Sequence, residues 1–593
     1  MKSTPDTTPA RPNLYPRNGK NIAMAAPIVI LLLVFLVYPV GQLLALSIHN
    51  KTGFTLIEYK RLFASSVYIE VLLITLKISL LTTFFSVLIG YPVALLISKL
   101  TGKRKNRVLY WVLLSFWTSF LVRTFAWMIL LERHGVVNWA LMHLGLIDQP
   151  LSLLYNLPAV LIGMVHSLMP LAILTMLSVM ENIDQRLPSA AATLGARPGT
   201  VFWRVYFPLS LPGVASAALM VFVTAIGFFI TPTLLGGRHD TMITQLIIDQ
   251  VMQSLNWGFA GAISVLLLIV VLAVFVVYDR LIGLSTMAGG NAGATAARGT
   301  RSGGRKLGEL TLTWLGNLTD LVVRLLPRSR RRAEQGHSLL LRVVALIVVV
   351  FLSAPAFLMI PLSFDAVPGL AWPPHGVSTQ WYQQVVDSPL WMSAIVRSMA
   401  VGIGTGVLSM LIGTPAAFLL VRGGLRGNAA ILAFILAPII VPRMILAVGL
   451  FYFFARIGLV GSSFGLVLGH TVVAVPYVVI TMMAVLRNYD IRLDFAAQSM
   501  GARPFTTLRR ITFPILSAGM LSAFLFAFAT SFDDLTIALF SSGGVSTTLP
   551  KQFWDTVTQE LSPVIAAVST GLFLFIFILI SVADRLRRRS LAS

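Results

Sequence analysis

The chain has 593 residues, of which 56% are hydrophobic and only 11% are charged. Soluble globular proteins carry about 25% charged residues, so the composition excludes an ordinary soluble fold and indicates a membrane protein. The net charge is +23 and cysteine is absent, which excludes disulfides, cysteine-bound metals and thiol chemistry.

The first half of the chain contains six long apolar runs, each near the length of about 20 residues that a bilayer requires. We predict membrane-spanning helices at 23–48, 71–98, 108–131, 157–180, 211–235 and 260–278. The first run is too long for a cleaved signal segment, so we expect it to stay as a helix.

Residues 283–338 interrupt the apolar pattern with a basic, Gly- and Ala-rich segment, which predicts a cytoplasmic linker. Its later part, 309–326, has apolar residues at helical spacing. We expect either an amphipathic helix on the membrane surface or a partly ordered linker helix. The linker separates two predicted domains, 1–282 and 339–593.

The second domain repeats the plan of the first. Six further spans are predicted at 339–364, 394–421, 429–454, 464–486, 516–540 and 564–582. The stretch "SVLIGYPVA" (86–94) recurs as "SMLIGTPAA" (409–417), an offset of 323 residues, and "VMENIDQRL" (179–187) recurs as "VLRNYDIRL" (485–493), an offset of 306. The sequence therefore predicts an all-α polytopic membrane protein of about 12 transmembrane helices in two equivalent six-helix halves.

The positive charges lie in short loops between the spans, such as "TGKRKNR" (101–107) and "RGGLRGN" (422–428). That distribution follows the positive-inside rule and does not favour nucleic-acid binding. It predicts that both termini are cytoplasmic. Each half has an even number of spans, so we expect the halves to be parallel and related by a pseudo-two-fold axis along the membrane normal.

One polar segment occurs in the same cytoplasmic loop of each half, between the fourth and fifth spans. Residues 190–208 read "AAATLGARPGTVFWRVYFP" and residues 496–514 read "AAQSMGARPFTTLRRITFP", which are identical at ten positions. The Ala-rich start favours a short helix, the glycine ends it, and the proline after it suits a second helix start. We predict two helical hairpins, within loops 181–210 and 487–516, that either dock a partner or serve only as folded re-entry loops.

The pattern Ala-Ala-x-x-Leu/Met-Gly-Ala, with a proline 13 residues after the glycine, resembles the EAA loop of ABC importer permeases. The resemblance implies that each loop holds a coupling helix that fits a groove on a cytoplasmic ATPase. The implied coupling residues are Ser189, Ala190, Ala191, Gly195, Ala196 and Pro208 in the first half, and Phe495, Ala496, Ala497, Gly501, Ala502 and Pro514 in the second. Ser189 and Phe495 replace the acidic residue of the family pattern, and Asp494 precedes the latter.

The resemblance extends to the spans themselves. Residues 116–131 and 227–237 are similar to the first permease of spermidine/putrescine-type importers, and residues 531–554 are similar to the second. This implies a fusion of two permeases in the bacterial inner membrane, served by two copies of an ATP-binding subunit and by an extracytoplasmic substrate-binding protein. The phosphate-binding pattern G-x-x-x-x-G-K-[ST] is absent from the sequence, so we expect ATP and Mg to be bound by the partner and this chain to need no cofactor or metal.

Two adjacent acids, Asp533 and Asp534, fall inside a predicted span, where ionisable residues are costly and mark function by default. One interpretation is that one of them lines the translocation pathway and attracts a cation. The alternative is a structural pairing with Arg123 or Arg443, which occupy matched places in the third spans of the two halves.

Taken together, the sequence predicts a transport permease of an ATP-driven importer for a small solute, with a polyamine-like organic cation as the expected substrate. The alternative is a secondary transporter driven by an ion gradient, because twelve spans in two parallel repeats suit that class as well.

Overall fold

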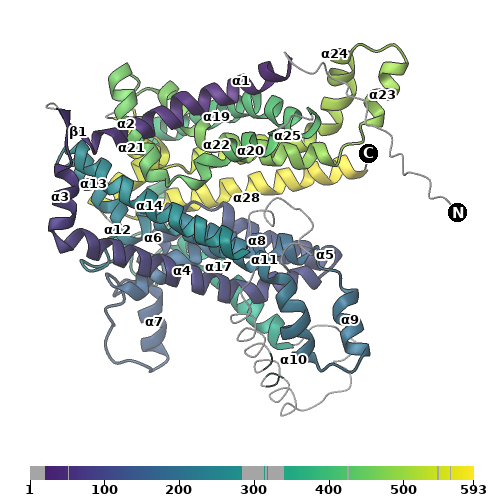
Figure 1. Cartoon of the computed structure of the whole chain (residues 1–593). Helices are drawn as coiled ribbons and strands as arrows, with labels where there is room; N and C mark the ends of the chain where they lie inside the picture. Colours follow the sequence, from purple (N-terminus) through teal and green to yellow (C-terminus); the bar gives the residue numbers. More distant parts are fainter. Residues whose placement is uncertain are drawn as a thin grey trace. The chain divides into compact units, whose positions relative to one another are not determined.

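The computed structural model describes residues 20–50, 53–282, 339–423, 427–543, 546–560 and 562–592, together with Thr313, Asn317 and Thr319. Over these residues the chain is almost entirely helical (Figure 1). A short antiparallel pair, β1 (His49–Asn50) and β2 (Gly53–Phe54), is the one sheet within them. Most of the helix expected at 309–326 lies outside the described residues.

The chain forms two compact units, and neither is continuous in sequence. Unit 1 combines Met1–Ala45, Ser388–Trp554 and Ser581–Ser593, whereas unit 2 combines Leu46–Asp387 and Asp555–Ile580. The first helix of the chain therefore belongs with the helices of the second sequence half. The division of the sequence into 1–282 and 339–593 stays a prediction.

Unit 1 contains the start of the chain and most of the second half. Its elements are α1 (Lys20–Leu32), the π-helical η1 (Leu33–Val37), α2 (Tyr38–Leu46), α19 (Pro389–Arg422), α20 (Asn428–Ile440), α21 (Arg443–Ile457), α22 (Ser463–Arg487), α23 (Arg492–Ser499), α24 (Pro504–Thr507), the π-helical η5 (Leu508–Thr512), α25 (Phe513–Phe532) and α26 (Thr536–Ser541). Helix α27 (Leu549–Gln559) begins in this unit and continues into unit 2.

Unit 2 contains the rest of the first half, with α17, α18 and parts of α27 and α28 from the second. Its elements beyond β1 and β2 are α3 (Ile57–Ala64), α4 (Ser66–Lys99), α5 (Gly102–Trp117), α6 (Phe120–Leu131), α7 (Val136–His143), α8 (Leu157–Met180), α9 (Arg186–Thr193), α10 (Pro198–Val201), the π-helical η2 (Phe202–Tyr206), α11 (Phe207–Ile226), α12 (Ile230–Leu235), α13 (Ile243–Met252), α14 (Trp257–Ile282), α17 (Leu339–Leu362), α18 (Gln380–Asp387) and the first part of α28 (Pro563–Ala592).

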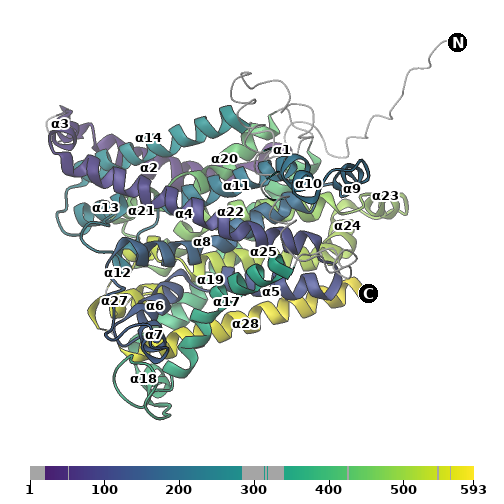
Figure 2. The same cartoon turned by 90° about the horizontal axis from the view of Figure 1, so that it is seen from below.

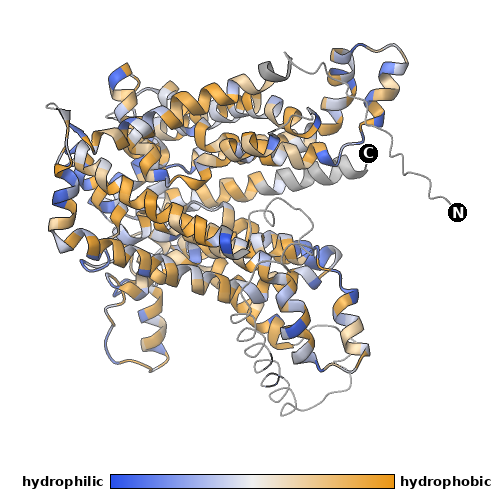
Figure 3. Ribbon diagram, in the orientation of Figure 1, coloured by the Kyte–Doolittle hydropathy of each residue, from blue (hydrophilic) through white to orange (hydrophobic). Residues whose placement is uncertain are grey.

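Within the described residues, nine helices are long and apolar enough to cross a membrane, or eleven if two bent pairs each count as one span. The last predicted span is present as the apolar stretch Pro563–Leu579 of α28. Figure 2 shows the long helices from a second side, and in Figure 3 most of their residues have the colour of hydrophobic residues. The structure confirms the expected fold class of an all-α polytopic membrane protein.

The core of each unit is a group of three helices taken from equivalent places in the repeat. In unit 2, α4, α8 and α11 pack on one another, and in unit 1 α19, α22 and α25 do the same. Helix α17 packs on α4, α5 and α6, whereas α1 packs on α19 and α20. The first helix of each sequence half thus contacts the core of the other half, an exchange that the hydropathy pattern does not reveal.

The helix of the second predicted span, α4 in the first half and α19 in the second, has an apolar exposed face and a polar buried face. Large apolar residues at helical spacing are exposed, namely Leu73, Leu80, Phe84 and Leu88 on α4 and Val396, Ile403, Val407 and Leu411 on α19. The buried face carries small hydroxyl residues, Thr75, Thr82 and Ser86 on α4 and Ser398, Thr405 and Ser409 on α19. This is the arrangement expected where lipid covers the apolar face and small polar residues allow close helix contact.

The third predicted span of each half is not a straight helix, which corrects the sequence prediction. Helix α5 meets the stretch Phe120–His143, which holds α6 and α7, at 92°, and α20 meets α21 at 90°. In the second half Pro442 follows Val441 at the bend, and a residue before proline avoids the helical conformation. In the first half the bend lies at Thr118 and Ser119, both of which have extended ψ angles.

Candidate functional site

The repeated polar segment forms a helical hairpin in each unit, as predicted. In unit 2 the hairpin consists of α9 and α10, and in unit 1 it consists of α23 and α24. Each second arm continues through a π-helical segment into a long apolar helix, so that 198–226 and 504–532 are continuous helical stretches. Figure 1 shows each hairpin extending beyond the helix bundle of its own unit.

The glycine of the motif sets the turn of each hairpin. Gly195 and Gly501 both have φ +87°, a left-handed conformation that glycine adopts without steric cost. In the first hairpin the N–H of Ala196 donates to the carbonyl of Ala191, and the N–H of Gly195 donates to that of Ala192, at 3.1 and 3.0 Å. The second hairpin makes the same two bonds at the equivalent positions. Both helices therefore end in a Schellman motif, which gives the two turns one shape.

The turns also present exposed apolar side chains. Leu194 is 88% exposed and Met500, its counterpart 306 residues later, is 81% exposed. Leu187 and Leu493 are a second equivalent pair, at 49% and 44%. Because these residues are outside the long apolar helices, contact with lipid does not explain their exposure.

The other residues of the motif differ in exposure. Six of them are exposed, namely Ser189, Ala190, Gly195, Ala496, Gly501 and Pro514. Five have intermediate burial, namely Ala191, Ala196, Pro208, Phe495 and Ala502. Ala497 is buried. At the position of the missing acid, Ser189 is exposed and its Oγ donates to the carbonyl of Gln185 at 2.9 Å. Phe495 is half-buried. The two halves thus present different chemistry there.

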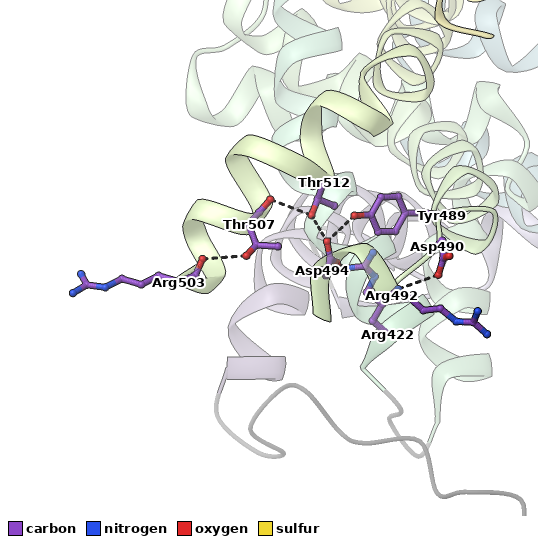
Figure 4. Close-up of polar contacts among 8 residues, drawn as sticks. All are labelled: Arg422, Tyr489, Asp490, Arg492, Asp494, Arg503, Thr507 and Thr512. Carbon is purple, nitrogen blue, oxygen red and sulfur yellow. Dashed lines mark hydrogen bonds and ion pairs between the residues drawn. The ribbon is translucent and has the colours of Figure 1, made fainter. Parts of the chain in front are cut away.

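Asp494, which precedes the altered position, lies at the centre of a buried polar cluster (Figure 4). Its Oδ2 pairs with Nη1 of Arg422 at 3.0 Å, and its Oδ1 accepts hydrogen bonds from the Tyr489 hydroxyl at 2.6 Å and the Thr512 hydroxyl at 2.8 Å. Burial, with the hydrogen bond to Asp494, raises the pKa of Tyr489 to about 12, so this phenol stays a proton donor. Arg422, Tyr489 and Thr512 were not among the site residues predicted from the sequence.

The two adjacent acids do not lie inside a helix, which corrects the sequence expectation. Helix α25 ends at Phe532, Asp533 follows as its C-terminal cap, and Asp534 lies in the break before α26. Oδ1 of Asp534 accepts the N–H of Ile537 at 2.8 Å in the first turn of α26. Asp534 is 3% exposed and lies 4.0 Å from Nη1 of Arg443 and 3.7 Å from Nε2 of His470.

The first half has no matching acid. Arg123, the counterpart of Arg443, is 3% exposed, and its Nη1 donates to the carbonyl of Ser167 at 2.8 Å. Phe228 occupies the place of Asp534, by the offset of 306 residues. Among the described residues no group of three or more metal-binding side chains occurs.

Comparison with known proteins identifies the repeat independently. The model of the family "binding-protein-dependent transport system inner membrane component" matches residues 20–284 and, separately, residues 409–591. The spermidine/putrescine transport system permease protein PotB of Haemophilus influenzae is 34% identical over 255 residues, which cover 42% of this chain and 89% of the relative. PotB of Escherichia coli is 35% identical over 39% of this chain and 83% of the relative. The permease protein PotC of the Haemophilus system is 26% identical over 41% of this chain and 95% of the relative.

Proposed function

The chain belongs to the family of binding-protein-dependent transport system inner membrane components, and we propose that it imports a polyamine-like organic cation. It is a permease subunit of an ABC importer and a multi-pass protein of the inner membrane, and it carries two permease repeats in one chain. The proposed substrate is supported by the transport systems in which the relatives act. Membership of this family also favours ATP-driven transport over the alternative of an ion-gradient-driven carrier.

The two hairpins are the proposed docking sites for two copies of a separate ATP-binding subunit. The observation that carries this proposal is the exposure of Leu194 and Met500 at the same place in two hairpins of the same shape. A groove on the partner would bury these side chains, and burial of one such side chain contributes about 1.5–3 kcal/mol. The absence of the acidic residue, at Ser189 and Phe495, leaves this contact mainly apolar.

We propose that all nucleotide chemistry belongs to the partner, which would bind ATP and Mg, and that this chain holds no cofactor of its own. When ATP closes the pair of partner subunits, the two hairpins are drawn together and the helices that carry them change the access of the pore. A substrate-binding protein would deliver the cation from the opposite side. In this arrangement both termini and both hairpins would lie in the cytoplasm, in agreement with the basic loops.

Asp533 and Asp534 are the proposed acidic groups of the pathway. The contact of Asp534 with Arg443 and His470 supports a structural role for this residue. We propose Asp533 as the group that attracts a cation, with Arg123 and Arg443 as the basic groups of the two halves. If Asp533 attracts a cation, Asp533→Asn should raise the polyamine concentration needed for half-maximal uptake more than Asp534→Asn does.

The docking proposal is tested with Leu194→Asp and Met500→Asp, singly and together. Each should weaken retention of the ATP-binding subunit on the purified chain by about tenfold to 100-fold, because a carboxylate replaces a buried apolar contact. The matched control is Val377→Asp, since Val377 is 86% exposed in the loop between α17 and α18. Retention of the subunit should not change in the control, and unchanged retention in the double variant Leu194→Asp/Met500→Asp would refute the docking assignment.

The substrate is tested in vesicles that contain the chain, its ATP-binding subunit and the binding protein. Labelled spermidine and putrescine should enter only with ATP, and excess unlabelled polyamine should compete. Uptake of a labelled phosphonate or opine in place of polyamine would keep the permease assignment and overturn the proposed substrate class.

A further inference from the structure

The three core helices of unit 1 are joined at one carboxylate on the hairpin. Asp494 is on α23, and its three partners come from three places: Arg422 is the last residue of α19, Tyr489 follows the end of α22, and Thr512 ends the π-helical segment that leads into α25. Helices α19, α22 and α25 are the ones that pack on one another in this unit. A displacement of the hairpin must therefore act on the ends of all three or break this cluster.

Arg422 is held tightly in the cluster. Its side chain is 9% exposed, and its guanidinium carbon lies 5.0 Å from the ring centre of Phe418 and 5.2 Å from that of Tyr489. Among the described residues, Nη2 of Arg422 has no hydrogen-bond partner. The Asp494 carboxylate is thus the anion that compensates this buried charge, and a buried charge without a partner is strongly unfavourable.

The first half joins its hairpin differently. Helices α4 and α19 correspond residue for residue at an offset of 323, so Lys99 is the counterpart of Arg422. At the offset of 306, Pro188 takes the place of Asp494 and Tyr206 that of Thr512. The Lys99 ammonium lies 5.5 Å from the Tyr206 ring centre, and the Tyr206 hydroxyl lies 3.2 Å from Oγ of Ser98. Pro188 has no side-chain acceptor, so the buried ion pair is confined to the second half.

We propose that Arg422 and Asp494 are positioning residues that clamp the second hairpin to α19, so that its movement enters the membrane through that helix. This rests on the proposed docking of ATP-binding subunits to both hairpins. The first hairpin, held by the exposed Lys99 and by Tyr206, is the more mobile of the two. Equal movements of the two ATP-binding subunits would thus have unequal effects on the membrane helices, and the more direct effect would be on those of the second half.

The absence of cysteine from the natural chain allows a direct test with introduced spin labels. Leu411→Cys with Ser499→Cys reports the distance between α19 and the second hairpin, and Leu88→Cys with Thr193→Cys reports the equivalent distance in the first half. In lipid nanodiscs, the distribution of distances between the two spin labels should be narrower for the 411–499 pair than for the 88–193 pair. Asp494→Asn and Arg422→Gln should each broaden the 411–499 distribution at least to the width of 88–193, whereas Arg422→Lys should keep most of its sharpness. Unchanged 411–499 distributions in both Asp494→Asn and Arg422→Gln would overturn the clamp.

A second readout tests transmission and not folding alone. In vesicles with the ATP-binding subunit and binding protein, Asp494→Asn should import about tenfold less spermidine per ATP hydrolysed, while retaining the ATP-binding subunit. The control Arg456→Gln, outside both hairpin loops, removes an exposed guanidinium that donates to the Tyr452 hydroxyl at 2.6 Å, and uptake per ATP should stay as in the parent. Retention of the subunit with unchanged uptake per ATP would refute the clamp alone, whereas a parent chain that does not retain the subunit would refute the docking proposal.

Discussion

Replacement of Gly519 by alanine should separate two core helices of unit 1. Gly519 is on α25, and an added Cβ would lie 2.5 Å from each methyl carbon of Val485 on α22 and 3.1 Å from its Cβ. Non-bonded carbon atoms prefer separations of about 3.5–4.0 Å. Because both methyl groups are equally close and valine is stiff at χ1 in a helix, rotation of Val485 cannot remove the clash. The helices must therefore move apart.

The expected cost follows from two opposing effects. Overpacking of this kind costs about 1–3 kcal/mol, and alanine in place of glycine within a helix returns about 0.5–1 kcal/mol. We expect Gly519→Ala to lower the free energy of unfolding by about 1–2 kcal/mol. The equivalent pair in unit 2 is Gly213 on α11 and Val179 on α8, where the added Cβ would lie 2.9 Å from the valine Cβ. Gly213→Ala should therefore act in the same direction.

The assay is a double-mutant cycle on the purified chain, with unfolding by denaturing detergent followed through tryptophan fluorescence. Val485→Ala removes both methyl groups, so the double variant Val485→Ala/Gly519→Ala should be more stable than the sum of the single changes predicts, by about 1–3 kcal/mol. Gly41→Ala is the control, because no atom lies within 4 Å of its added Cβ. A Gly519→Ala chain as stable as the parent, or a cycle without coupling energy, would refute the packing argument.

Three further predictions concern the charged groups. Asp494→Ala leaves Arg422 buried without its anion, so the local stability of α23 should fall by about 3–5 kcal/mol. Amide hydrogen exchange in α23 should become faster by the corresponding factor, and exchange rates equal to those of the parent would contradict the buried ion pair. Asp534→Ala should lower thermal stability by about 1–2 kcal/mol, because α26 loses the acceptor for Ile537 N–H while Arg443, whose side chain is 41% exposed, keeps contact with solvent. Asp534→Asn keeps an acceptor and should recover most of that loss in the same thermal scan. The exposed ion pair between Lys105 and Glu181 should contribute less than about 1 kcal/mol to the free energy of unfolding. A larger loss of stability in Lys105→Gln would contradict the argument that exposure to solvent weakens this ion pair.

The hairpins were predictable because their signals are local. A run of alanines, a glycine and a proline within nine residues specify a helix, its Schellman end and the next helix start, and each step depends on the backbone of a few neighbours. The structure confirms this at Gly195 and Gly501, in both copies. The docking role of the same residues stays a prediction, because it depends on a partner surface.

The acidic residues were harder to interpret, because their roles depend on distant parts of the chain. Asp533 and Asp534 were expected inside a helix, since the apolar run continues past them, yet the helix ends at Phe532. The cluster around Asp494 joins positions 422, 489, 494 and 512. The repeat offers one sequence signal for this cluster, because Asp494 of the second half is replaced by Pro188 at the equivalent position of the first half.

The sequence by itself determined the membrane class, the two repeats and the two hairpins, because apolar length, internal similarity and helix-end residues are properties of short stretches of chain. Only the tertiary structure decided the right-angle bends in the third spans, the exchange of the first helices between the halves, and the ion pair on the second hairpin. Apart from small hydroxyl residues such as those on α4 and α19, both the lipid-facing and the buried sides of the spans are largely apolar, so hydropathy alone does not say which faces meet. Close contact at small residues and pairing of the few buried charges choose among the packings.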